Sequence, residues 1–271
     1  MRCAVVGQPV GHSLSPVLWR AAYDALGLSG WTYDAIDCDA EELERLVRRG
    51  GFAGLSVTMP HKHLAARLVD RVVGRTAGAV NTIVFDAEGT TGHNTDVDGI
   101  AAALASVGFG AGSGGGSGGG SGAGSVAVLG AGGTAAAAVL AVQAAGGHAT
   151  LVARNGAAAL DLKSRTGGMA SFEPWTRARE VVAGADAVVN TTPKGAADEL
   201  AAGWTGAPLV DVLYDPWPTP LARAAEAGGH PVAGGLYVLV HQALRQIELV
   251  TGSRPEAAAL LEAGEQALAA R

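Results

Sequence analysis

Three features are scarce in this sequence: cysteine, positive charge and long apolar runs. The 271 residues include two cysteines, Cys3 and Cys38, which are too few for a disulfide framework and favour a reducing compartment. The apolar residues 3–6 are too few for a signal peptide, and no apolar run is long enough to span a bilayer. We therefore expect a cytoplasmic protein with no membrane partner.

The deficit of positive charge limits the ligands that the surface attracts. The chain has 19 Lys and Arg against 25 Asp and Glu, a formal net charge of −6, which argues against a nucleic-acid surface. An anionic ligand would need a few local basic groups. An apolar fraction of 48% and a charged fraction of 16% are ordinary for a globular protein, and the length suits two domains. No metal site is predicted.

One stretch, residues 125–140, has the pattern of a nucleotide-binding turn. The apolar run before Gly130 suits a parallel strand covered on both faces, and an alanine-rich helix follows. Gly130 permits a tight turn, Gly132 lets the backbone approach a ligand, and Ala135 keeps the helix close to the strand. The helix N-terminus then offers free N–H groups and a partial positive charge to a phosphate. The pattern predicts a dinucleotide site, with a merely tight strand–helix turn as the alternative in a chain of 41 glycines.

The next strand indicates which dinucleotide is bound. Folds that bind NAD usually carry Asp or Glu at the end of the second strand, where the carboxylate holds the ribose hydroxyls. Here the strand 150–153 ends in Arg154. A guanidinium can pair with a 2′-phosphate in a fork, whereas an acid would repel it. We therefore expect NADP, with a solvent-facing arginine as the alternative.

Strand and helix patterns alternate along both halves of the chain. In the first half, Ser15 is expected to cap a helix with Pro16 at its first position, and another helix is expected over 61–73. In the second half, strands near 126–129, 150–153, 187–190 and 209–212 predict a doubly wound parallel sheet. The last helices, near 237–250 and 255–269, are expected to return to the first domain.

Residues 109–125 separate the two halves and consist mainly of glycine and serine. They cannot bury apolar surface, so we expect a flexible loop without chemistry of its own. Natural low complexity and an inserted linker both remain open.

Polar residues at the ends of predicted elements in the first half indicate what kind of substrate the protein binds. Ser13 and Ser15 put two hydroxyls near one helix N-terminus, a natural cradle for a carboxylate, although an N-cap and a spare serine would look the same. Thr58 and Lys62 follow a strand, where a lone lysine is usually a solvated surface group. These residues define a candidate site only in combination with others.

The order of these motifs resembles that of the shikimate dehydrogenase family, over nearly the whole chain except the Gly/Ser run. The matching segments are Ser13-x-Ser15-Pro16, Val57-Thr58-x-Pro60-x-Lys62, Gly78-Ala79-Val80-Asn81-Thr82, Asn94-Thr95-Asp96, Gly130-Ala131-Gly132-Gly133, Ala153-Arg154-Asn155, Asn190-Thr191-Thr192-Pro193, Asp211 to Pro216, and Gly235-Leu236 with Gln242. Any one of them is a weak signal. Nine such segments in the family's order are a specific signal for the family.

The resemblance implies an NADP-dependent shikimate dehydrogenase, which reversibly reduces 3-dehydroshikimate to shikimate on the route to aromatic amino acids. It implies an N-terminal substrate-binding α/β domain, 1–108 with 237–271, and a C-terminal doubly wound Rossmann domain, 126–236. The catalytic pair would be Lys62 and Asp96. Substrate would contact Ser13, Ser15, Thr58, Asn81, Asp96, Tyr214 and Gln242. NADP would contact Gly130, Ala131, Gly132, Gly133, Arg154, Asn155, Thr191, Leu213 and Gly235.

Two departures from the family pattern bear on affinity. The family often has Asn where this chain has Ser56, and a second basic residue where it has Ala158. A hydroxyl at 56 can still donate one hydrogen bond. The missing basic group predicts weaker binding of the 2′-phosphate. Lys163 or Arg165 would compensate if the helix that follows Arg154 placed either side chain near the phosphate.

Two rival functions stay open at this point. A relative acting on quinate, with NAD or with either cofactor, would share the fold, but Arg154 speaks against NAD. A non-catalytic NADP-binding sensor would need neither Lys62 nor Asp96. A monomer and a homodimer are both compatible with the sequence.

Overall fold

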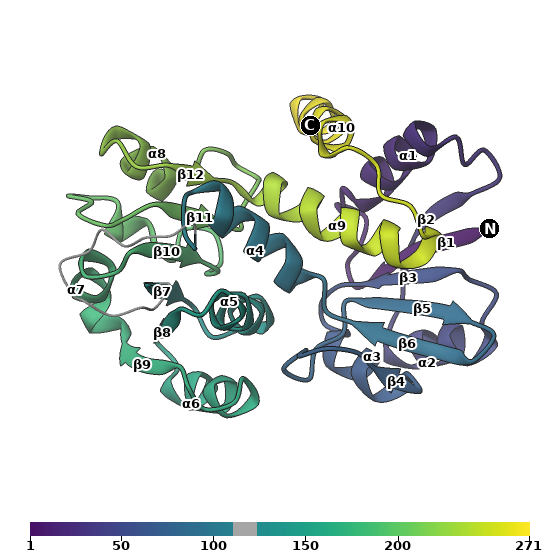
Figure 1. The fold of residues 1–271 in the computed structure, drawn as a ribbon, viewed down its shortest axis with the longest axis horizontal. Helices are drawn as coiled ribbons and strands as arrows, with labels where there is room; N and C mark the ends of the chain where they lie inside the picture. The colour runs from purple at the N-terminus through teal and green to yellow at the C-terminus, as the bar shows by residue number, and fades with distance from the viewer. Residues whose placement is uncertain (111–123) are drawn as a thin grey trace. The chain divides into compact units, whose positions relative to one another are not determined.

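The computed structural model describes residues 1–110 and 124–271 (Figure 1). The predicted Gly/Ser loop therefore lies almost entirely outside the described residues. The rest divides into two compact units, Met1–Thr95 with Leu239–Arg271 (unit 1) and Asp96–Val238 (unit 2). Within the described ranges, no helix is both long and apolar enough to cross a membrane.

Unit 1 is built on a mixed six-stranded sheet of order β2-β1-β3-β5-β6-β4. Strand β1 lies parallel to β2 and β3, while β5 runs antiparallel to β3 and β6. The strands are β1 Arg2–Gly7, β2 Thr32–Asp37, β3 Gly54–Val57, β4 Arg71–Val72, β5 Thr82–Asp86 and β6 Gly89–His93. A hairpin joins β5 to β6, and Asp86 pairs with Gly89 at its turn.

The helices of unit 1 pack around this sheet or against one another. They are α1 Ser15–Leu26, α2 Ala40–Arg49, α3 Lys62–Leu68, α10 Ala257–Ala269, and the part of α9 (Gly235–Thr251) that belongs to unit 1. Helices α2 and α3 pack on one face through Leu43, Leu46 and Ala65, which lie against Leu55 and Ile83 of the sheet. Helix α1 packs against α10. The carboxyl ends of β1 and β3 thus lead into the loops that carry the polar motifs.

The N-cap expected for α1 is wrong by one residue. The cap is Leu14, and Ser15 is already helical. The cause is the Ser13 hydroxyl, which accepts the Ser15 N–H at 3.2 Å and closes a turn just before the helix. Pro16 therefore occupies the second helical position rather than the predicted first, still within the first turn.

The helix expected over 61–73 is also too long. Helix α3 ends at Leu68, because the chain bends at Val69 and Asp70 and enters β4 at Arg71. Asp70 accepts the Thr90 N–H and hydroxyl, each at 2.8 Å, and β4 then pairs with β6. Pairing with a distant strand has overridden the local helical pattern.

Unit 2 contains a six-stranded sheet in which every pair of neighbours is parallel, of order β12-β11-β10-β7-β8-β9. Taken from β7 onward this is the strand order 3-2-1-4-5-6 of the doubly wound dinucleotide-binding fold, which confirms the predicted fold class. The strands are β7 Ser125–Leu129, β8 His148–Ala153, β9 Ser171–Pro174, β10 Ala187–Asn190, β11 Leu209–Asp211 and β12 Val232–Ala233. The edge strands β9 and β12 were not predicted.

Helices flank the sheet of unit 2. They are α4 Asp96–Ser106, α5 Gly133–Ala144, α6 Gly156–Arg165, α7 Ala178–Ala183 and α8 Pro220–Ala227, with 3-10 turns at Trp175–Arg177 and Asp198–Leu200. All residues of α5 from Ala135 to Val142 are buried, because alanine lets α5 approach both β7 and α4 closely. Strands β7 and β10, where the strand order reverses, lie at the centre of the sheet.

Candidate functional site

The glycine turn lies at the point where the strand order of unit 2 reverses, between the carboxyl ends of β7 and β10. Gly130 has φ +114°, and a Cβ there would lie 2.5 Å from the Thr191 hydroxyl oxygen. That hydroxyl donates to the Leu129 carbonyl at 2.7 Å. The fold itself therefore requires glycine at 130. Parallel α/β sheets bind ligands at this kind of reversal.

Gly132 and Gly133 are different, because nothing in the fold requires them. A Cβ at either position would have no heavy atom within 4 Å, and neither residue has a positive φ. Gly132 is the N-cap of α5, and no side chain caps that helix. A side chain at either position would fill open space beside the first turn of α5. This is the cradle that a pyrophosphate needs.

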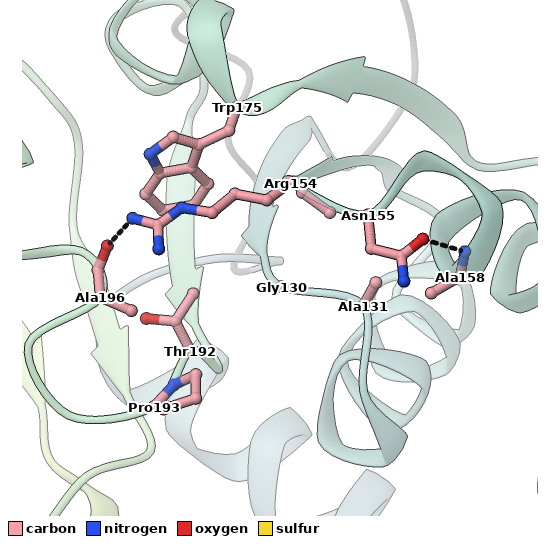
Figure 2. Close-up of a pocket in the computed structure, with 10 residues that line it drawn as sticks. Gly130, Ala131, Arg154, Asn155, Ala158, Trp175, Thr192, Pro193 and Ala196 are labelled. Atoms are coloured by element: carbon pink, nitrogen blue, oxygen red, sulfur yellow. Dashed lines mark hydrogen bonds between the residues drawn. The ribbon is translucent and has the colours of Figure 1, made fainter.

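A pocket of about 330 Å³ opens beside this turn (Figure 2). It brings together four of the nine predicted cofactor residues, namely Gly130, Ala131, Arg154 and Asn155. Gly132, Gly133, Thr191, Leu213 and Gly235 are not among its lining residues. Asn155 caps α6 by accepting the Ala158 N–H at 3.0 Å. Its side chain therefore has a structural task at the pocket wall.

Arg154 is held in a defined place on the pocket wall rather than pointing loosely into solvent. Its guanidinium lies over the Trp175 indole, 5.0 Å from the ring centroid, and donates to the Ala196 carbonyl at 2.9 Å (Figure 2). The Glu199 carboxylate is 3.7 Å from the same guanidinium and accepts the Trp175 indole N–H at 2.6 Å. Two residues that the sequence analysis missed, Trp175 and Glu199, thus position the cation.

Positive charge is limited at this pocket. Of the described residues that line it, Arg154 alone is charged, and Ala158 forms part of the wall. Arg165 pairs instead with Asp161 at 2.8 Å, and Lys163 does not line the pocket. Neither compensates for Ala158 in this structure.

A buried carboxylate organises the loop after β11. Asp211 is fully buried and accepts hydrogen bonds from the Asn190 amide, the Leu213 N–H and the Thr219 hydroxyl at 2.8 to 3.2 Å. Burial raises its pKa, and the three donors oppose that shift. The Gly235 N–H donates to the Leu213 carbonyl at 3.1 Å, so Asp211 indirectly fixes where α9 begins. Tyr214, next along this loop, is half-buried.

The predicted substrate residues fall in both units. Ser13, Ser15, Thr58, Lys62, Asn81 and Gln242 belong to unit 1, whereas Asp96 and Tyr214 belong to unit 2. Ser13 and Ser15 stand at the start of α1, as expected. The Thr58 N–H donates to the Val6 carbonyl at 2.9 Å, which continues the β1–β3 pairing one residue past β3.

Lys62 is the first residue of α3, half-buried, and its backbone is firmly anchored. The Lys62 carbonyl accepts the Val80 N–H at 2.9 Å. The preceding residue, His61, is buried and donates from Nε2 to the Cys38 carbonyl at 2.8 Å. Both bonds fix the point from which the lysine side chain extends.

Asn81 has a structural role that its sequence motif does not reveal. It is buried, its side-chain oxygen accepts the Thr95 N–H and the Thr82 hydroxyl at 2.8 Å each, and its amide donates to the Thr95 hydroxyl at 3.1 Å. Thr95 immediately precedes Asp96, the buried first residue of α4. Asn81 thus anchors the chain directly before the predicted catalytic carboxylate.

Known proteins resemble this chain over nearly its whole length. Residues 5–83 match the family model for the shikimate dehydrogenase substrate binding domain. The shikimate dehydrogenase (NADP(+)) of Exiguobacterium sibiricum is 35% identical over 95% of both chains. The structure of Mycobacterium tuberculosis shikimate dehydrogenase matches with a TM-score of 0.85 at 38% identity, covering 98% of this chain and 99% of that one.

A third match has ligands in its site. It is shikimate 5-dehydrogenase from Thermus thermophilus in complex with NADP(H) and shikimate, with a TM-score of 0.83 at 33% identity, covering 98% of this chain and 99% of that one. Identity above 30% across almost complete chains, together with one shared fold, confirms the resemblance indicated by the motif order. The chain belongs to the shikimate dehydrogenase family.

Proposed function

We propose that this chain is an NADP-dependent shikimate dehydrogenase, which reversibly reduces 3-dehydroshikimate to shikimate. The observation that carries the proposal is the full-length likeness to shikimate dehydrogenases in a chain that retains Lys62 and Asp96. A sensor would need neither residue. Shikimate is a step toward aromatic amino acids, so the enzyme would serve their biosynthesis.

The residues present in unit 2 fit NADP. Open space at Gly132 and Gly133 beside the first turn of α5 suits the pyrophosphate, and Gly130 and Ala131 continue that wall. Arg154 would take the 2′-phosphate, with Asn155 beside it. By the family resemblance, Thr191, Leu213 and Gly235 would lie along the nicotinamide half. When bound, NADPH supplies a hydride. The protein supplies position and electric field.

The residues of the chain would handle the proton and the ring substituents. Ser13 and Ser15 hold the substrate carboxylate, and Thr58, Asn81, Asp96 and Gln242 bond the ring hydroxyls, with Tyr214 nearby. Lys62 in its ammonium form donates a proton to the carbonyl oxygen as that oxygen becomes an alkoxide, and its charge stabilises the oxygen before the proton moves. In the reverse direction Lys62 takes the proton back.

The domain assignment follows from this division of labour. We propose residues 1–108 and 237–271 as the substrate-binding domain and 126–236 as the NADP-binding domain. The compact units have slightly different boundaries from these ranges. Unit 2 also contains α4 and the first residues of α9.

Location and assembly are further parts of the proposal. We propose a cytoplasmic enzyme that acts as a monomer or homodimer. Cys3 and Cys38 are both buried and unpaired, and burial raises the pKa of both thiols, which suits a compartment where thiols stay reduced.

One assay tests the proposed activity. Absorbance of reduced cofactor is followed with shikimate or quinate, each with NADP or NAD. We expect shikimate with NADP to give the highest kcat/KM. A higher value for quinate, or for NAD, would replace the proposal with a quinate or NAD enzyme. The absence of turnover with all four pairs would favour a sensor.

Gly132→Ala is expected to weaken NADP binding roughly tenfold without harming the fold. A methyl group there meets no atom of the protein, but it fills the space proposed for the pyrophosphate. Calorimetric titration with NADP and a thermal unfolding curve measure both effects. Gly30→Ala is the matched control, since a Cβ at Gly30 also meets nothing. Unchanged NADP affinity in Gly132→Ala would place the pyrophosphate elsewhere.

Arg154→Ala is expected to raise the Kd for NADP about tenfold and to change that for NAD much less, because only NADP carries the 2′-phosphate. The side chain is 63% exposed, which limits the gain from one charged hydrogen-bonding group. Titration with both cofactors measures the difference. Arg165→Ala removes an arginine outside the pocket and serves as the control. Equal losses for NADP and NAD would show that Arg154 does not recognise the phosphate.

A further inference from the structure

Helix α9 crosses strand β3 in a fixed register. A Cβ at Gly54 would lie 2.5 Å from Val250 Cγ2, so the helix touches the strand where only glycine fits. Two residues further along β3, the Ser56 hydroxyl donates to the Gln246 side-chain oxygen at 3.0 Å. Two strand residues rise about 6.6 Å and four helix residues about 6 Å, so the two contacts are successive rungs of one ladder.

Continued by the same rise, the ladder would set Thr58, one residue past β3, opposite Gln242. Thr58 is two residues beyond Ser56 on the same face of the chain, and its N–H still pairs with β1. Gln242 is one helical turn before Gln246 and half-buried. Both are residues that we propose to bond substrate hydroxyls. The register of α9 on β3 therefore decides whether their polar groups reach the same molecule.

Gln246 ties α9 to two neighbouring strands of the sheet, β3 and β5. It is 3% exposed. Its amide nitrogen donates to the Thr82 hydroxyl at 2.9 Å and to the Asn81 carbonyl at 3.3 Å, on β5 and just before it. On β3, Ser56 also accepts the Tyr33 hydroxyl at 2.8 Å. Such a buried network is costly to leave half-made, so it resists sliding or rotation of the helix.

We propose that Gln246 and Ser56 are positioning residues for substrate binding. They contact no substrate, and they fix α9 against β3 so that Gln242 and Thr58 act on one ligand. The inference rests on the proposed function, because it presumes that Gln242 binds shikimate.

Gln246→Leu tests the proposal. Leucine keeps much of the volume and removes every hydrogen bond, which leaves α9 free to shift. We expect kcat/KM for shikimate at saturating NADP to fall roughly fivefold to tenfold, the scale of losing one hydrogen bond to the substrate. KM for NADP at saturating shikimate is expected to stay within about twofold of the wild-type value. Ser56→Ala, which removes one hydroxyl, is expected to act in the same direction with a smaller effect, and it stands in if Gln246→Leu does not fold.

A double-mutant cycle with Gln242→Ala separates positioning from simple destabilisation. If Gln246 acts through Gln242, then Gln246→Leu costs little more once Gln242 is alanine. Additive losses would overturn the inference while leaving the substrate role of Gln242 intact. No loss in Gln242→Ala alone would overturn both the inference and the proposed substrate site.

A stability control completes the experiment. Val47→Ala trims the core on the other helix layer, at α2, and is expected to lower Tm without changing kcat/KM for shikimate. An equal fall of kcat/KM in Val47→Ala and Gln246→Leu at equal loss of Tm would mean that stability alone explains the effect, and would overturn the positioning role.

Discussion

Lys62→Ala is expected to lower kcat by roughly 100-fold or more, the usual scale for a positioned general acid–base group. The variant loses both the proton that the alkoxide needs and the positive charge that stabilises it. The anchored backbone on either side, through His61 and the Lys62 carbonyl, suggests that the fold will tolerate alanine there. KM for shikimate is expected to change far less, since the other proposed substrate contacts remain.

Steady-state kinetics with shikimate and NADP, together with calorimetric titration by NADP, measure this outcome. Lys163→Ala is the control, because Lys163 lies in the last turn of α6 and does not line the pocket beside Gly130 and Arg154. Turnover near the wild-type value in Lys62→Ala would remove Lys62 from the mechanism. A loss confined to KM would instead make it a binding residue.

Lys62 and Arg154 illustrate which parts of a site can be predicted from sequence. Both follow strands, and the structure has both at element ends, as predicted, while their chemical roles stay predictions. The groups that hold Arg154 could not be predicted. Trp175 and Glu199 lie in other elements, and only the folded chain brings the indole and the carboxylate to the guanidinium.

The same limit explains the errors in the fold. Buried central strands such as β7 and β10 are continuous apolar runs, so their pattern suffices. The edge strands β9 and β12 are short and only partly buried, and no periodicity marks them. Helix α3 ends early because Asp70 and β4 bond to β6, which no local pattern records.

Gln246 was missed for a geometric reason. Its position in α9 resembles that of any polar residue on an amphipathic helix. The contact between Gly54 and Val250 sets which face of α9 meets β3, and that contact joins residues far apart in the sequence. The hydrogen bonds of Gln246 to the sheet are therefore visible only in the folded structure, where α9 lies against β3.

Glycines give the sharpest contrast between sequence and structure. The sequence alone cannot tell a glycine required by the fold from one that leaves room for a ligand. The space available for a Cβ distinguishes the two kinds of glycine. A Cβ at Gly132 would meet no atom within 4 Å, whereas a Cβ at Gly235 would clash with backbone atoms. Substitutions at the two positions should therefore fail in different ways.

Gly235→Ala is expected to lower both Tm and kcat/KM, the latter by roughly 100-fold. Its Cβ would lie 2.2 Å from the Val212 carbonyl oxygen and 2.7 Å from the Leu213 carbonyl carbon, both backbone atoms. The first turn of α9 must therefore move by roughly 1 Å, and displacements of that size cost about 100-fold when they reach a reacting group. Overpacking adds a loss of about 1–3 kcal/mol in the free energy of unfolding.

The loop that opposes this movement makes the prediction specific. Asp211 holds the Leu213 N–H, and the Leu213 carbonyl accepts the Gly235 N–H, so the loop after β11 resists the shift and α9 must take up most of it. Thermal unfolding and NADP titration then distinguish the two glycines. Gly132→Ala should lose NADP affinity at an unchanged Tm, whereas Gly235→Ala should lose both. A Gly235→Ala variant with wild-type Tm and kcat/KM would mean that the start of α9 is free to move and does not set the geometry of the cofactor site.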